Sequence, residues 1–163
     1  MKLRIATPDD ASALKAIMKP VVADSTATFS SVEKTEEEWA ALVARRIEEG
    51  RAFYVAELNG EVAGYATYEQ FRSSNNGYRF TMEHSVYLSD AAQGQGFGRI
   101  LLIAIEEHAR EAGHKSMIGV IDADNTASIA FHEALGYKEV GRIPQSGYKF
   151  DRWLDALFMQ KIL

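Results

Sequence analysis

The sequence predicts an α/β fold, in the wider α+β sense, with a mixed central sheet of about six to seven strands and about four flanking helices. Phe53–Leu58 and Val62–Tyr68 read as strands, and Asn59-Gly60 between them is a strong hairpin signal. Capped amphipathic runs alternate with further strand-like segments later in the chain. This order of elements favours one sheet with helices packed against it.

Two helices precede the predicted hairpin. Thr7 followed by Pro8 marks the start of the first helix, which we expect to reach about Pro20 or to run slightly past it. Thr35 and Glu38 form a capping box for the second. The expected order in this half is a strand at Lys2–Ala6, the first helix, a loop at Asp24–Val32, the second helix to about Gly50, and the hairpin.

The second half alternates strands and helices. A glycine-dense turn, "QGQGFG" at 93–98, separates a strand from a long amphipathic run. Gly113 and Gly136 are expected to end the two helices of this half. The expected elements are a loop at 73–77, a strand at Arg79–Ser89, a helix to about Ala112, a strand at Ser116–Ile121, a short helix at Asn125–Leu135, and two strands in 137–163 with a turn around Ser146-Gly147.

Composition limits the possible functions. The 163 residues suit a single domain, 1–163, and the formal charge of -5 argues against a nucleic-acid partner. There is no cysteine, so disulfides, thiolate metal sites and a cysteine nucleophile are excluded, and we expect no metal. No apolar run approaches the roughly 18 residues of a membrane span, and the N-terminus turns acidic too early for a signal peptide. We therefore expect a cytoplasmic protein with no membrane partner.

The three glycines Gly94, Gly96 and Gly98 are the most informative local feature. Glycines before a helix let backbone N–H groups crowd around an anion, which the helix dipole favours. A dinucleotide site would show G-x-G-x-x-G after an apolar strand, whereas the spacing here is G-x-G-x-G and the strand carries Glu83. A P-loop would continue with Lys-Ser or Lys-Thr, but Arg99-Ile100 follows. A plain flexible turn before a helix is the remaining alternative.

Several longer motifs favour an anion site. The stretch 93–98 fits the Q/R-x-x-G-x-G/A pattern of the GNAT superfamily of N-acetyltransferases, and the order of elements resembles that acetyltransferase fold over nearly the whole chain. The chain resembles most its phosphinothricin and methionine sulfoximine/sulfone acetyltransferase subgroup. The segments that carry this resemblance are "GYATYEQFR" at 64–72, "TMEHSVYL" at 81–88, "NTASIAFHEALGY" at 125–137 and "GYKFDRWLD" at 147–155.

The resemblance implies that the glycine turn holds the pyrophosphate of acetyl-coenzyme A (acetyl-CoA) and that the preceding strand pairs with the pantetheine arm. For Arg99 the alternative is a solvated arginine, and for Asn125 it is a helix N-cap, which is compatible with a contact to pantetheine. The implied donor-binding residues are Val86, Tyr87, Leu88, Gly94, Gln95, Gly96, Phe97, Gly98, Arg99 and Asn125.

The resemblance implies two catalytic candidates. Glu83 stands just before the donor-binding strand segment, where partial burial would raise its pKa toward the range of a general base. His132 stands seven residues after Asn125, where many members of the superfamily have a tyrosine beside the leaving sulfur. A histidine there can donate a proton or act as the base, so the choice between Glu83 and His132 stays open. With no cysteine available, direct attack in a ternary complex is the simplest route.

The acceptor is expected to be a small, acidic, amino-acid-like amine. Arg72 and Arg79 stand at the ends of a loop before the Glu83 strand, where guanidinium groups suit an acidic group. The resemblance implies acceptor contacts at Arg72, Ser73, Ser74, Glu83, His84 and Ser85. At Ser73-Ser74 the chain departs from the subgroup, which often has bulkier residues there. Phe29 either walls this pocket or anchors its own loop.

The expected function is transfer of an acetyl group from acetyl-CoA to the primary amine of a phosphinothricin, methionine sulfone or methionine sulfoximine type of acceptor. The alternatives are acetylation of another small amine and a non-catalytic CoA-binding regulator. The subgroup resemblance also implies a homodimer.

Overall fold

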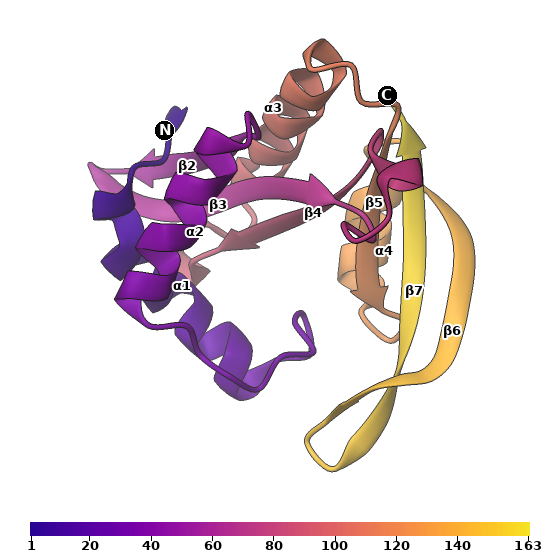
Figure 1. Cartoon of the computed structure of the whole chain (residues 1–163). Helices are drawn as coiled ribbons and strands as arrows, with labels where there is room; N and C mark the ends of the chain where they lie inside the picture. The colour runs from indigo at the N-terminus through magenta and orange to yellow at the C-terminus, as the bar shows by residue number, and fades with distance from the viewer.

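One seven-stranded mixed sheet runs through the computed structural model, which describes all 163 residues (Figure 1). Its strand order is β1-β2-β3-β4-β5-β7-β6, and only the β4–β5 pair is parallel. The predicted class is confirmed. The strands are β1 (Lys2–Ile5), β2 (Phe53–Leu58), β3 (Glu61–Gln70), β4 (Thr81–Leu88), β5 (Ser116–Asp122), β6 (Lys138–Lys149) and β7 (Arg152–Ile162), and the helices are α1 (Ala11–Asp24), α2 (Glu36–Glu48), α3 (Phe97–Glu111) and α4 (Thr126–Glu133).

Local signals set most of the element boundaries. At the start of α2, Glu38 N donates to Thr35 Oγ1 over 3.2 Å and Thr35 N donates to Glu38 Oε2 over 2.8 Å, which completes the predicted capping box. Asn59 and Gly60 have φ values of 54° and 88°, as a primed two-residue hairpin turn requires. The helix α1 runs past Pro20, as expected, and ends at Asp24.

Helices cover both faces of the sheet, and each face has its own apolar core. On one face α1 and α2 pack over Phe53, Val55 and Tyr65. On the other face α3 and the segment after α4 pack over a larger core that includes Ala66 and Tyr68. Because successive strand residues point to opposite faces, β3 contributes to both cores.

The same alternation divides β4. Met82 belongs to the α3 core, and Val86 and Leu88 pack against it, whereas Tyr87 packs against the α1–α2 core. Glu83 therefore shares its face with Tyr87, and His84 lies on the opposite face.

The strands β4 and β5 separate after a short parallel ladder. Only Thr81–Glu83 pair with Ser116–Ile118, although β5 continues to Asp122 and pairs with β7 along its whole length. From residue 84 onward the edge of β4 that faces β5 has no partner strand, and Figure 1 shows the two strands diverging there. The sheet thus opens in its middle.

Hydrogen bonds hold the connection between α1 and α2 against the C-terminal ends of β5 and β6, next to this opening. Lys149 is buried, and its ammonium group donates to the carbonyl oxygens of Ser25 over 2.5 Å and Thr28 over 2.9 Å. Thr26 also donates to the carboxylate of Asp122 at the end of β5. These contacts tie the connection to β5 and β6.

The β6–β7 turn differs from the prediction. It lies at Phe150-Asp151, whose φ values are 53° and 54°, rather than at Ser146-Gly147. Gly147 lies inside β6 and leaves room for a ring: a Cβ there would stand 2.5 Å from Cδ2 of Phe29. The glycine therefore marks a close approach between distant segments, and Phe29 anchors its loop there.

No helix of this structure combines the length and the apolar character needed to cross a membrane.

Replacing Gly147 with Ala should lower the free energy of unfolding by about 1–3 kcal/mol, because the new methyl group overlaps the Phe29 ring. Chemical denaturation of Gly147→Ala in the parent and in a Phe29→Ala background measures this. The cost should nearly disappear when Phe29 is already Ala. An equal cost in both backgrounds would show that Gly147 matters for another reason.

Candidate active site

A cavity of about 1370 Å³ lies along the part of β4 that follows its ladder with β5. Its walls come from α1, β4, the glycine turn before α3, and α4. Several residues predicted from the sequence line this cavity. They are His84, Val86, Tyr87, Leu88, Gly94, Gly98, Asn125 and His132.

The glycine turn shapes the start of α3. Gly94 and Gly96 have φ values of 70° and 83°, and a Cβ on either would meet nothing within 4 Å. Gly98 has ordinary helical geometry, and a Cβ there would touch Phe131 at 3.5 Å. Two glycines therefore provide the left-handed backbone, while the third lies in close contact with α4.

This turn fits a phosphate group. Gly96 is the N-cap of α3 and offers no side chain to the first-turn amides, which leaves them free for an anion at the positive end of the helix dipole. Phe97 is buried in the core, whereas Gln95 and Arg99 are exposed. Phe97 thus supports the turn from inside, and Arg99 is the one cation on its first helical turn.

The unpaired edge of β4 fits an extended amide-bearing ligand. The residues after Glu83 have no strand beside them on the β5 side, so their outward N–H and C=O groups are free to pair with such a chain. Asn125 lies across the cavity and caps α4, since its Oδ1 accepts from Ser128 N over 3.0 Å. The glycine turn and this edge together suit the pyrophosphate and the arm of acetyl-CoA.

The structure places His84 and His132 in contact. Their Nε2 atoms are 3.2 Å apart and their ring planes are nearly parallel, with an interplanar angle of 12°. His132 Nδ1 is 2.7 Å from the carbonyl oxygen of Ser128, so this nitrogen carries a proton and donates it. The neutral His132 then accepts at Nε2, and His84 Nε2 donates to it.

Burial keeps both rings neutral. It lowers the pKa of His84 to about 3, with a further contribution from His132. It also lowers the pKa of His132, against the opposing hydrogen bond to Ser128 and the charge of Glu106. A neutral pair shares one proton between its two Nε2 atoms.

The room for this pair comes from Gly119 on β5, a residue that the sequence analysis did not select. A Cβ at this position would stand 2.8 Å from His84 Nε2 and 3.1 Å from His132 Nε2. A lone glycine inside a strand is a known sign of close approach by another group. This signal was present in the sequence, but the identity of the approaching group was not.

Glu83 lies on the other face of β4 and is not among the residues that line the cavity. Burial raises its pKa, and the neighbouring carboxylate of Glu69 raises it further. The two catalytic candidates, Glu83 and His132, therefore flank the opening from opposite faces of the sheet.

The predicted acceptor residues are divided in the same way. Ser85 shares the face of Glu83, whereas His84 belongs to the pair with His132. Arg72 has a left-handed φ of 48°, and its guanidinium lies 5.3 Å from the centre of the Tyr78 ring. Ser73 and Ser74 are exposed in the same turn. These three residues lie outside the cavity lining, in the connection between β3 and β4.

The chain is similar to known acetyltransferases over nearly its whole length. A family model described as an acetyltransferase (GNAT) domain matches residues 3–158. The chain is 39% identical over 161 residues to the L-methionine sulfoximine/L-methionine sulfone acetyltransferase of Salmonella typhimurium, covering 98% of this chain and 93% of that protein.

Two solved structures are also similar. The crystal structure of a phosphinothricin acetyltransferase from Sinorhizobium meliloti in complex with AcCoA has a TM-score of 0.94 and 36% identity, covering 99% of this chain and 88% of that chain. A ribosomal-protein-alanine N-acetyltransferase from Brucella melitensis has a TM-score of 0.96 and 42% identity, covering all of both chains.

Replacing Gly96 with Val should abolish the binding of acetyl-CoA, because a branched side chain would occupy the space that the phosphates need. Isothermal titration calorimetry measures this binding. Gly113→Val is the matched control, since Gly113 has the same φ of 83°, also has nothing within 4 Å of its Cβ position, and follows the far end of α3. Equal binding losses in both variants would mean that backbone strain, not the site, is responsible.

Proposed function

The chain belongs to the GNAT family of acetyl-CoA-dependent acetyltransferases, and from this premise we propose that its acceptor is the primary amine of a small, acidic, amino-acid-like molecule. The proposed acceptor class is that of methionine sulfone, methionine sulfoximine and phosphinothricin. This proposal rests on the similarity, over almost the entire chain, to the L-methionine sulfoximine/L-methionine sulfone acetyltransferase of Salmonella typhimurium. Acetylation of a peptide N-terminus is the second candidate, favoured by the similarity to the ribosomal-protein-alanine enzyme.

The donor is held mostly by backbone in this proposal. The amides from Gly94 to Arg99 bind the pyrophosphate, and the free edge of Val86, Tyr87 and Leu88 pairs with the pantetheine arm. Asn125 contributes from the start of α4. The co-substrate supplies an activated thioester, and the open sheet lets the arm run between the two faces.

Glu83 acts as the general base in this proposal. An acceptor amine is mostly protonated near neutral pH, with a reference pKa of about 8 or higher, and only its neutral form attacks. The Glu83 carboxylate lies just upstream of the proposed pantetheine-binding segment, so it can take the proton directly or through one water. The raised pKa of Glu83 makes it a stronger base than an exposed glutamate.

His132 is the alternative base. In the neutral form of His132, Nδ1–H donates to the carbonyl oxygen of Ser128 and the lone pair of Nε2 accepts from His84. Neither nitrogen is therefore free to take a proton from the substrate amine. This arrangement favours Glu83 as the base. We place His132 beside the donor arm, where together with His84 it forms a neutral wall of the cavity.

Arg72 binds the acidic group of the acceptor in this proposal. Its guanidinium stacks over Tyr78 and is in no ion pair, so it remains available to an external anion. Ser73 and Ser74 add hydroxyl groups to the same turn, and Ser85 lies beside Glu83 on β4. The acceptor then lies with its amine near Glu83 and its acidic end toward the β3–β4 connection.

We also propose a homodimer and a cytoplasmic location. The β6–β7 hairpin exposes large apolar side chains that a partner could cover. They are Val140, Ile143, Tyr148, Phe150 and Trp153. Acetyl-CoA-dependent chemistry needs a compartment that contains this thioester, and the cytoplasm is such a compartment.

Assays with a panel of different acceptor amines test the proposal. Free-thiol release from acetyl-CoA should be fast with methionine sulfone, methionine sulfoximine or phosphinothricin, and slow with an aminoglycoside and with a peptide that begins with alanine. Arg72→Ala should raise the KM of the preferred acceptor at least tenfold and leave the KM of acetyl-CoA nearly unchanged. Preference for the peptide would replace the proposed acceptor class, and no release with any amine would favour a CoA-binding regulator.

Replacing Glu83 with Gln should lower kcat by roughly 100-fold or more and remove the acidic limb from the pH profile of kcat/KM. A base works only above its pKa, so activity should fall as the pH drops through that value, and the raised pKa of Glu83 places this fall above the ordinary glutamate range. Binding of acetyl-CoA should stay close to that of the parent. If the limb persists in Glu83→Gln and disappears in His132→Asn, the histidine is the base.

A further inference from the structure

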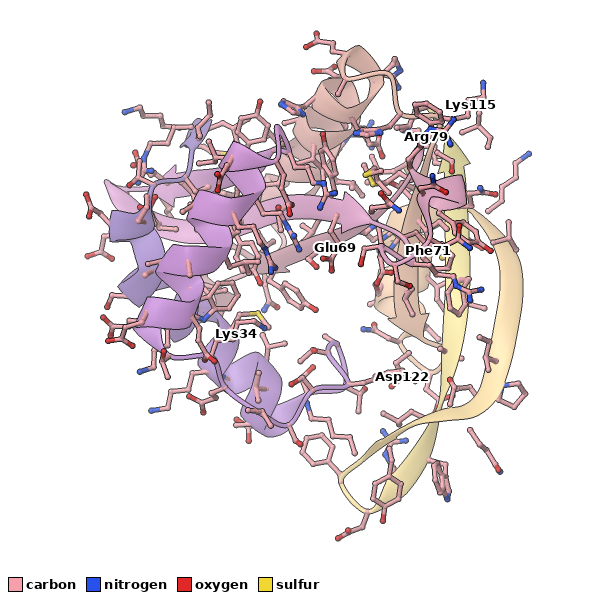
Figure 2. The ribbon with its side chains drawn as sticks, in the orientation of Figure 1. Lys34, Glu69, Phe71, Arg79, Lys115 and Asp122 are labelled. Carbon is pink, nitrogen blue, oxygen red and sulfur yellow. The ribbon has the colours of Figure 1, made fainter.

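Three charged residues from three elements meet on the face of the sheet that α1 and α2 cover. Arg46 of α2 donates from Nη2 to Oε2 of Glu69 on β3 over 2.7 Å. Glu69 stands directly opposite Glu83 in the antiparallel β3–β4 ladder. Figure 2 shows the side chain of Glu69 extending from β3 toward the space between the two halves of the sheet.

The register places the two carboxylates close together. Residues directly opposite in an antiparallel pair have Cβ atoms about 4.5–5.5 Å apart and point to the same face, and like charges in this position repel each other. The Glu69–Glu83 pair is therefore unfavourable unless one charge is neutralised. Such an arrangement makes a proton on Glu83 more favourable.

Arg46 neutralises Glu69 only in part. Its side chain is 6% exposed, whereas the side chain of Glu69 is 51% exposed and largely solvated. The Arg46 guanidinium also lies 3.7 Å from a second carboxylate, that of Glu49, and its buried Nε has no hydrogen-bond partner. The Arg46 guanidinium is thus buried and interacts with two carboxylates, those of Glu69 and Glu49.

Few other charges face Glu83. From its own strand, Tyr87 shares the face, and burial raises the pKa of its phenol, with a smaller contribution from Glu83. From β5, the residue in register with Glu83 is the apolar Ile118. The charged groups that surround Glu83 are thus Glu69 from β3 and, through it, Arg46 from α2.

We propose that Glu69 is a positioning residue that sets the protonation range of Glu83, and that Arg46 controls how strongly Glu83 experiences the charge of Glu69. This inference rests on the proposed role of Glu83 as the base. In the reaction an N–H bond of the acceptor breaks and an O–H bond forms on Glu83, while Glu69 remains an anion. The neighbouring negative charge makes Glu83 a better proton acceptor.

The test compares the acidic limb of kcat/KM in variants that change the two charges separately. Glu69→Gln should move the limb to lower pH, because the repelling charge is gone. Arg46→Met should move it to higher pH, because the charge of Glu69 is no longer offset. Arg46→Lys, which keeps the positive charge, should leave the limb near that of the parent. A structural defect would not move the limb in opposite directions.

Two controls separate this inference from general effects. Glu107→Gln, on the exposed surface of α3, changes the net charge by the same amount as Glu69→Gln and should not move the limb. Thermal unfolding of each variant reports whether it is folded at the assay temperature. If the buried Arg46→Met variant does not fold, Glu69→Gln and Arg46→Lys still decide the question, because only the former should shift the limb.

The outcomes also distinguish this inference from the proposed function. If Glu83→Gln removes the limb but Glu69→Gln leaves it in place, or if Glu69→Gln and Arg46→Met shift it in the same direction, the inference is wrong while Glu83 keeps its role. If the parent transfers no acetyl group, or if Glu83→Gln keeps the limb, the proposed function of Glu83 itself fails and this inference fails with it.

Discussion

The geometry of the candidate site follows from the separation of β4 from β5. The two strands share a parallel ladder only from Thr81 to Glu83, and beyond it the backbone of β4 faces open space. An unpaired strand edge in the middle of a sheet costs hydrogen bonds, so it persists only when other contacts hold the two halves in place. Lys149 and the Thr26–Asp122 hydrogen bond provide such contacts next to the opening.

In the proposed reaction, this opening lets the single strand β4 contact the donor and also carry the base. The alternation along β4 sends Glu83 and Ser85 to the face covered by α1 and α2, and sends His84 and Val86 to the face of α3 and α4. The cavity is lined from both sides of β4, by α1 and by α4, whereas Glu69 and Arg46, the charged groups near Glu83, are not among its lining residues. The proposed base and the proposed donor site therefore have different neighbours.

Much of the fold follows from local sequence signals. The capping box at Thr35, the turn at Asn59-Gly60 and the glycines before α3 each specify a backbone conformation within a few residues, so their elements appear where the sequence predicts them. The predicted position of the β6–β7 turn was wrong because a glycine at 147 is typical of a turn. In the structure this glycine instead makes room for the ring of Phe29, which is far away in the sequence.

The site was predictable to a smaller extent, for a similar reason. Which residues share the face of Glu83 depends on cross-strand register, so the position of Glu69 opposite it could not be read from spacing along the chain. Likewise, Gly119 has meaning only once His84 and His132 are seen in front of it. The resemblance to the acetyltransferase subgroup indicated which segments of the chain carry the candidate site. The face of the sheet on which each side chain lies could be assigned only from the fold.

We propose above that the free edge of β4 binds the arm of acetyl-CoA. Amide hydrogen–deuterium exchange with and without acetyl-CoA measures this binding residue by residue, because exchange reports new hydrogen bonds at each backbone amide. Acetyl-CoA should slow exchange within residues 84–88 and within the turn at 94–99, with little change at the ladder of Thr81–Glu83. Protection that appears in the turn but leaves residues 84–88 unchanged would mean that the arm does not pair with β4.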